Sequence, residues 1–269
     1  MILEPISRAF AALAQRADTQ IDLTEGAILI AALYSPQLDR RAEAARIDSL
    51  AAEAAAALAG GAGRTRALAL AHWLFVEQGF AGNHLNYYDP RNSFLPEVLT
   101  RRLGIPIALA VLYLEVARRV GQPAFGVPLP GHFVIGAPVE GGTIYLNPFG
   151  GEELPRHALE ALAARAVGRP VRIDGFLRPA SRRAILVRML QNLKQIYLSR
   201  ESWELALRAI DWILLLTPES LLDRRDRGLL AFRLGQYGDA IAHLRRYLQA
   251  APAGAERDRI SRLLASLAS

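Results

Sequence analysis

The chain has 269 residues, of which 52% are hydrophobic and 22% charged, a composition typical of a globular protein with a buried core. It contains no cysteine, which excludes disulfides, cysteine-ligated metals and thiol nucleophiles. The formal net charge of +6 suggests an acidic partner, but only Lys194 among the 32 basic residues is a lysine and the arginines are interspersed with acidic residues, so we do not expect a nucleic-acid partner.

The N-terminal segment does not have the pattern of a signal peptide. Charged residues recur through it, at Glu4, Arg8, Arg16 and Asp18. Apolar runs elsewhere, such as Ile105–Leu114, are too short to span a bilayer. We therefore expect a cytoplasmic protein with no membrane association.

The first eighty residues predict helices, because apolar residues recur there at helical spacing and turn residues separate the runs. Asp22 and Thr24 are candidate caps for the second of these helices. The expected helical segments are Ile6–Leu13, Ala27–Leu33, Leu38–Leu58 and Thr65–Glu77.

The segment from Phe80 to Leu99 is dense in Asn, Tyr, Asp, Gly and Pro, which favour turns and side-chain bonds to the backbone. It is a loop packed over the domain, the lip of a ligand groove, or both, since loops beside a cleft are where ligands lie. The candidate ligand-binding residues are Asn83, Tyr87, Tyr88, Asp89, Arg91, Asn92 and Glu97, together with His132 from the strand region further along the chain. His84, Asp89 and Glu97 have no standard metal-site spacing, and we expect neither a metal nor a cofactor.

Two further helices follow this segment. Ser93 is either a helix cap or, as the hydroxyl within this segment, a nucleophile, and Gly104 ends the helix that we expect after it. Pro106 suits the first turn of the next helix, where a missing N–H costs nothing. Ile107–Val116 is apolar on nearly every face, so this helix is expected to be central and buried.

Short apolar runs separated by Pro-Gly and Gly-Gly turns then predict an antiparallel sheet. Its strands are expected at Ala124–Leu129, His132–Ala137 and Thr143–Leu146, with a helix at Pro155–Val167 after them. Helices followed by strands indicate the α+β class.

The C-terminal third has a period of 34 residues, which separates Trp203 from Tyr237, Ala206 from Ala240, and Pro218 from Pro252. This is the tetratricopeptide period. Gly228 stands where paired helices need a small residue, and Lys194 occupies the equivalent position of a degenerate first repeat. We expect Trp203 in the core and residues 255–268 as a capping helix.

A hairpin of the last two strands would bring His132 and Asn147 opposite or nearly opposite each other, close to the start of the buried helix. Asn147 could then orient the imidazole of His132, as the third member of a triad orients a base. Alternatively, His132 is a structural histidine and Asn147 a turn-forming Asn-Pro.

The order helix start, strand His, strand Asn resembles that of the papain-like transglutaminase core, and the chain resembles the SirB family of bacterial proteins. The motifs that carry this resemblance are Tyr87-Tyr88-Asp89-Pro90-Arg91-Asn92-Ser93-Phe94-Leu95, Arg101-Arg102-Leu103-Gly104-Ile105-Pro106-Ile107, Pro130-Gly131-His132-Phe133 and Asn147-Pro148-Phe149-Gly150-Gly151. The resemblance implies a papain/transglutaminase-like α+β domain with a small antiparallel sheet, followed by all-α tetratricopeptide-like repeats.

The resemblance also implies a catalytic triad that this chain has lost in part. Where active transglutaminase-like enzymes carry cysteine, the chain has Pro106, and Ala108 stands where the family often has a hydroxyl. Asn147 replaces the family's usual Asp. Pro106, His132 and Asn147 are therefore vestigial triad positions, and we expect no catalytic residue among them.

We accordingly expect a transglutaminase-like domain over residues 1–175, helical to about residue 80, and helical repeats over residues 178–269. The favoured function is a non-catalytic module that binds a protein or peptide through the vestigial cleft and the repeats. The alternatives are a hydrolase or acyl-transfer enzyme that uses His132 without cysteine, and a regulator that contacts nucleic acid through its arginines.

Overall fold

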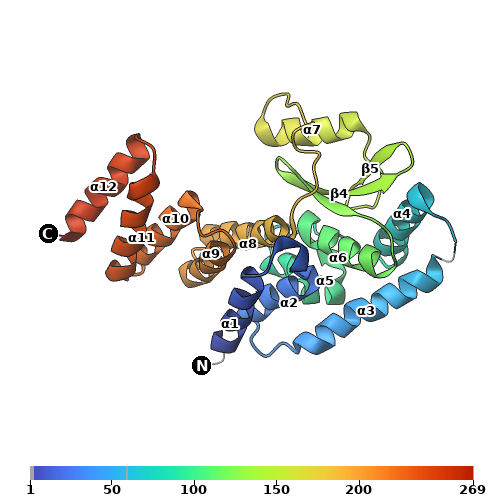
Figure 1. The fold of residues 1–269 in the computed structure, drawn as a ribbon, viewed down its shortest axis with the longest axis horizontal. Coiled ribbons are helices and arrows are strands. Elements are labelled where there is room, and N and C mark those ends of the chain that lie inside the picture. The colour runs from blue at the N-terminus through green and yellow to red at the C-terminus, as the bar shows by residue number, and fades with distance from the viewer. Residues whose placement is uncertain (1–2, 59, 269) are drawn as a thin grey trace. The chain divides into compact units, whose positions relative to one another are not determined.

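A computed structural model describes residues 3–58 and 60–268 of the chain (Figure 1). Its α-helices are α1 (Leu3–Ala14), α2 (Leu23–Tyr34), α3 (Arg40–Ala57), α4 (Gly63–His72), α5 (Leu95–Arg101), α6 (Pro106–Arg119), α7 (Arg156–Val167), α8 (Arg182–Ser199), α9 (Trp203–Leu216), α10 (Leu221–Arg233), α11 (Tyr237–Ala250) and α12 (Ala255–Ala268). Its strands are β1 (Ala81–Gly82), β2 (Leu103–Gly104), β3 (Phe125–Leu129), β4 (His132–Val139) and β5 (Gly142–Leu146). Short 3₁₀ segments are η1 (Asp18–Gln20) and η3 (Pro90–Ser93), and η2 (Trp73–Glu77) is a π-helix.

The described residues divide into two compact units. The first lies within Met1–Ala9 and Arg16–Met189, and the second within Phe10–Gln15 and Leu190–Ser269. The predicted limits of the family domains, near residues 175 and 178, stay a prediction. No helix within residues 3–58 and 60–268 combines the length and apolar character that crossing a membrane requires.

The predicted N-terminal helices are confirmed. Asp22 caps α2 by accepting a hydrogen bond from the Glu25 N–H (2.9 Å), whereas Thr24 lies inside the helix. The expected helix at Thr65–Glu77 is present as α4 continued by the π-helix η2, whose Trp73 is buried.

Helix α6 is the centre of the first unit, as its sequence predicts. Pro106 occupies its first turn, and nearly every residue as far as Ala117 is buried. Gly121 follows the helix with φ +73°, a conformation that glycine adopts without strain, and so ends it.

The predicted antiparallel sheet is also present, in the order β3-β4-β5. Figure 1 shows α6 on one side of this sheet and α7 on the other. Val127 and Val134, which pair across β3 and β4, belong to a buried cluster with Leu159 and Ala163 of α7. The sheet is therefore covered on both faces, and the α+β class is confirmed.

Two features near β1 differ from the prediction. Strands β1 and β2 form a parallel pair, Ala81 with Leu103 and Gly82 with Gly104, which two-residue segments do not reveal in a sequence. Ser93 does not cap a helix: α5 begins after Phe94, with Pro96 in its first turn. The Ser93 hydroxyl is buried and has no hydrogen-bond partner among the described residues.

The second unit is a stack of helices with the predicted repeat positions. A Cβ on Gly228 would lie 2.6 Å from the side chain of Leu244 on α11, so α10 and α11 approach each other there too closely for any larger residue. Residues 255–268 form α12, as expected. Trp203 is only half-buried, which corrects the prediction: the guanidinium of Arg233 covers its ring at 4.0 Å from the ring centroid.

Candidate functional site

The loop from β1 to η3 is braced by two buried asparagines. The side-chain amide of Asn83 donates to the side-chain oxygen of Asn92 (3.1 Å). The Asn92 amide donates in turn to the backbone carbonyls of Asn86 (2.7 Å) and Tyr87 (3.2 Å). Because these amides are used to close the loop, Asn83 and Asn92 position neighbouring residues.

Asp89 is a buried carboxylate that stabilises the same loop. Its side chain accepts from the backbone N–H of Arg91 (3.0 Å) and from the Arg91 guanidinium (2.7 Å), and Arg101 lies 3.6 Å away. Burial alone would raise the pKa of Asp89, but the hydrogen bonds from Arg91 and the nearby charges outweigh burial and hold that pKa below its ordinary value. Asp89 is therefore ionised and fully engaged in structure.

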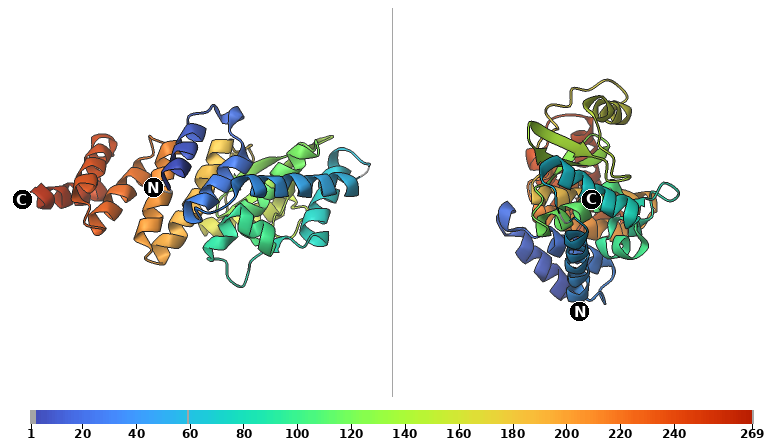
Figure 2. Two further views of the ribbon diagram at one scale, coloured as in Figure 1. Left: turned by 90° about the horizontal axis from the view of Figure 1, so that it is seen from below. Right: turned by 90° about the vertical axis from the view of Figure 1, so that its right-hand side faces the viewer.

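The tip of this loop presents apolar and aromatic side chains to solvent. Leu85 is fully exposed at 101%, and Tyr88 and Tyr87 are 66% and 40% exposed. In Figure 2 the teal loop around residues 83–90 projects from the body of its unit. Apolar residues held outward on an ordered loop are typical of a protein-binding surface.

The ring of Phe149 lies beside this loop and gathers several predicted residues around it. Its centroid is 5.0 Å from that of His84, 6.1 Å from that of His132 and 6.4 Å from that of Tyr87. Gly82 makes room for the ring, because a Cβ there would lie 2.4 Å from it. We did not predict a role for Phe149, although it stands in the Asn147-Pro148-Phe149 motif, which was the available signal.

His132 begins β4 with its Nε2 buried and without a hydrogen-bond partner among the described residues. Burial lowers the pKa of His132, while hydrogen bonding to Asn147 and the charge of Glu152 act in the opposite direction. His132 is therefore a neutral imidazole at pH 7. Asn147 lies just beyond β5, whose last residue, Leu146, pairs with Ile135. It is close enough to His132 to hydrogen-bond it and so to affect its pKa.

Asn147 also shapes the turn that follows β5. Its amide donates to the Glu152 carboxylate (2.6 Å), and its side-chain oxygen accepts from the Phe149 N–H (3.1 Å). The side-chain oxygen thus closes an Asx turn, which is the alternative role that the sequence left open for this residue, and the amide ties the turn to Glu152.

The start of α6 is tied to the same loop through backbone bonds. The N–H of Asn83 donates to the carbonyl of Gly104 (3.1 Å), and the N–H of Ile105 donates to the carbonyl of Asn92 (3.1 Å). Pro106 and Ala108 follow directly and are buried. Neither side chain has an atom that could act as a nucleophile.

Arg91 and Glu97 lie at a different feature, a cavity of about 210 Å³. Tyr34 at the end of α2 and Phe94 are among the other residues that line it. Two of the predicted ligand-binding residues, Arg91 and Glu97, therefore line a cavity apart from the surroundings of Phe149. Across residues 3–58 and 60–268, no three His, Asp or Glu side chains gather closely enough to hold a metal ion.

The titration of His132 is a direct measure of this environment. We expect its pKa below the ordinary value of 6.5, because burial disfavours the imidazolium. Asn147→Asp should raise that pKa by placing a carboxylate beside the ring, and Glu152→Gln should lower it by removing a charge. An NMR pH titration of the imidazole ¹⁵N shifts measures the pKa of His132 in the wild type and in both variants. A wild-type pKa above 6.5, or no response to Asn147→Asp, would contradict the assigned geometry.

The chain resembles known families over most of its length. Residues 41–191 match the transglutaminase-like superfamily, and residues 193–265 match the tetratricopeptide repeat. No solved structure matched the chain.

Similar proteins include bacterial and mammalian sequences. The UPF0162 protein of Xylella fastidiosa (strain Temecula1) is 44% identical over 189 residues, which are 68% of this chain and 67% of that protein. The UPF0162 protein of Vibrio cholerae is 31% identical over 235 residues, 86% of this chain and 87% of the relative. F-box only protein 21 of Mus musculus is 32% identical over 181 residues, which cover 62% of this chain and 28% of that protein.

Proposed function

Because the chain belongs to the UPF0162, or SirB-type, family of the transglutaminase-like superfamily and continues into tetratricopeptide repeats, we propose that it is a non-catalytic protein-interaction module. The lack of a thiol, and of a nucleophilic side chain at Pro106 and Ala108, supports the non-catalytic part. The sequence has no cysteine, and Pro106 and Ala108 stand at the start of α6. A cytoplasmic location belongs to the same proposal, because a chain without cysteine needs no oxidising compartment to fold.

The exposed loop tip is the observation that carries the proposal. Leu85 and Tyr88 face solvent, while Asn83, Asn92 and Asp89 hold the backbone beneath them. A preorganised loop loses little conformational entropy on binding, and exposed Tyr is among the residues that contribute most to interfaces. The partner class that fits is a protein or peptide with a complementary apolar face, and the repeats can supply a second contact surface.

The double variant Leu85→Asp/Tyr88→Ser tests the loop. Both side chains are solvent-exposed, so we expect the variant to keep its thermal stability and to lose partner binding at least about tenfold, equivalent to about 1.4 kcal/mol. Quantitative affinity capture from native cytosol, with the bound protein then purified for titration, measures the loss.

Two further variants locate the contact. Val76→Ser/Phe176→Ser changes two exposed apolar residues that are not part of the loop (56% and 39% exposed) and should bind as wild type. Leu222→Asp alters the repeats, where Leu222 is 63% exposed. If the loop variant binds normally and Leu222→Asp does not, the loop proposal is wrong and the repeats carry the interaction.

A second function has one observation in its favour. A neutral imidazole with an unpartnered Nε2 is the form that a general base requires, so His132 could activate water or a substrate hydroxyl. Turnover of an amide or ester substrate that Asn147→Ala weakens and His132→Ala abolishes would favour an enzyme of altered mechanism over the interaction module.

A further inference from the structure

A cavity of about 420 Å³ opens in the first unit, separate from the loop tip and from His132. Its volume lies within the range of small-molecule sites. Helix α2, the beginning of α3 and the end of α6 form its walls. The lining residues are Asp22, Thr24, Glu25, Ile28, Leu29, Arg40, Arg41, Ala44 and Arg119.

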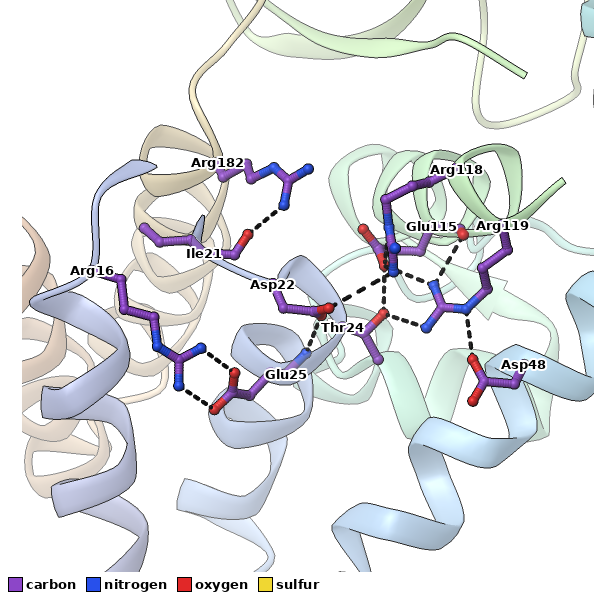
Figure 3. Close-up of polar contacts among 10 residues, drawn as sticks. All are labelled: Arg16, Ile21, Asp22, Thr24, Glu25, Asp48, Glu115, Arg118, Arg119 and Arg182. Carbon is purple, nitrogen blue, oxygen red and sulfur yellow. Dashed lines mark hydrogen bonds and ion pairs between the residues drawn. The ribbon is translucent and has the colours of Figure 1, made fainter. Parts of the chain in front are cut away.

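Most charges in this wall are already neutralised, as Figure 3 shows. Glu25 pairs with Arg16 (2.5 Å), and Asp22 lies 3.7 Å from Arg118. Arg119 pairs with Asp48 (2.7 Å) and with the buried Glu115 (2.8 Å). These internal pairs leave the two acidic groups of the cavity with little capacity to repel an anion.

Arg40 and Arg41 are different. They are exposed at the mouth of the cavity, and among the described residues their guanidinium groups have neither an ion pair nor a hydrogen bond. The floor below them is apolar, because Ile28 and Leu29 are 3% and 1% exposed, and Ala44 of α3 lies beside them. The site thus combines two unpaired positive groups at its mouth with an aliphatic interior.

We propose that this cavity binds a small organic oxyanion, with its charged group on Arg40 and Arg41 and its apolar body against Ile28 and Leu29. Guanidinium groups bind carboxylates, phosphates and sulfonates through paired N–H donors, and such charge-assisted bonds are the strong ones. The apolar body gains free energy from burial in the cavity. This site is independent of the loop-tip interaction proposed above.

The probe is 1-anilinonaphthalene-8-sulfonate, which joins a sulfonate to an apolar aromatic body and fluoresces on burial. Two variants test the two halves of the site. Arg40→Gln/Arg41→Gln removes the charges, and Ala44→Leu fills the interior while keeping them. Each is expected to weaken probe binding about tenfold or more.

The matched control is Arg169→Gln/Arg172→Gln, which removes the same two charges from exposed positions outside the cavity. It should bind the probe as wild type, and all variants should unfold at the wild-type temperature. Wild-type affinity in either cavity variant, or an equal loss in the control, would overturn the proposal. Competition by octanoate and by octyl phosphate then separates carboxylate from phosphate ligands.

Discussion

Replacing Glu115 with alanine is expected to lower the free energy of unfolding of the first unit by about 3–5 kcal/mol. Glu115 is 2% exposed and accepts hydrogen bonds from the Thr24 hydroxyl (2.6 Å), Arg118 (2.9 Å) and Arg119 (2.8 Å) (Figure 3). Removing the carboxylate leaves two guanidinium groups facing each other without the shared anion. Urea denaturation, followed by hydrogen exchange of α2 and α6, measures the loss.

The pH dependence follows from the same contacts. Burial alone would raise the pKa of Glu115, but the hydrogen bonds from Arg118, Thr24 and Arg119 outweigh burial and lower that pKa below its ordinary value of 4.5. The folded state therefore binds fewer protons than the unfolded state, and stability falls as the pH drops below about 4.5. The stability advantage of wild type over Glu115→Gln should be complete at pH 7 and shrink in acid.

Glu160→Ala is the matched control for this experiment. Glu160 also pairs with an arginine, Arg156, but its side chain is 44% exposed. A pair in solvent contributes little, so this variant should lose less than about 1 kcal/mol. Equal losses for Glu115→Ala and Glu160→Ala would show that the buried network does not stabilise the unit.

A second large effect is expected in the repeats when Lys194 is replaced with methionine. The Lys194 ammonium, 4% exposed, contacts Asp223 (2.8 Å) and Asp226 (2.5 Å). Asp223 is 6% exposed, and without Lys194 its charge stays buried; among the described residues, the Gln191 amide (2.9 Å) and the Ser220 hydroxyl (2.6 Å) remain as its side-chain partners. We expect a loss of about 3–5 kcal/mol in the second unit, measured by urea denaturation and by hydrogen exchange of α10.

A second substitution shows whether Lys194→Met loses stability because it leaves a buried charge or because it loses packing. Asp223→Asn removes that charge, so Lys194→Met/Asp223→Asn should recover part of the stability that Lys194→Met loses. Asp226 is not left unpaired, because Arg225 also contacts it (2.7 Å). Arg259→Ala, which removes an exposed pair with Glu256, should cost less than about 1 kcal/mol. No recovery in the double variant would mean that charge burial is not the cause.

Much of the fold follows from local sequence signals. Pro106 and Gly121 bound α6, Gly-Gly and Pro-Gly turns mark the hairpins, and a 34-residue period marks the repeats. Each signal acts within one element or between neighbouring elements. Such signals depend on backbone conformation and on the apolar pattern, which a sequence displays directly.

The polar interior could not be predicted in the same way. The bond between Thr24 and Glu115 joins residues 91 positions apart, and the sequence marks Lys194 only as a departure from the small residue of the repeat. Lys194 lies on α8, whereas its partners Asp223 and Asp226 lie on α10. The surroundings of Phe149 are likewise not visible in the sequence, because its neighbours come from two segments distant from it, the loop with His84 and Tyr87 and the strand with His132. Long-range pairings of this kind depend on the assembled tertiary structure.

The pairing of Lys194 with Asp223 gives the repeat stack a direction. Lys194 and Gly228 hold equivalent positions 34 residues apart, yet one carries a cation that needs an acidic neighbour and the other has no room for any side chain. The two helix pairs are therefore not interchangeable. Lys194 lies on α8 and its acidic partners lie on α10 of the following pair, so exchanging the pairs would leave this buried ammonium without them. The native order of the helix pairs is thus stabilised by a contact between them, whereas the close approach at Gly228 stays within one pair.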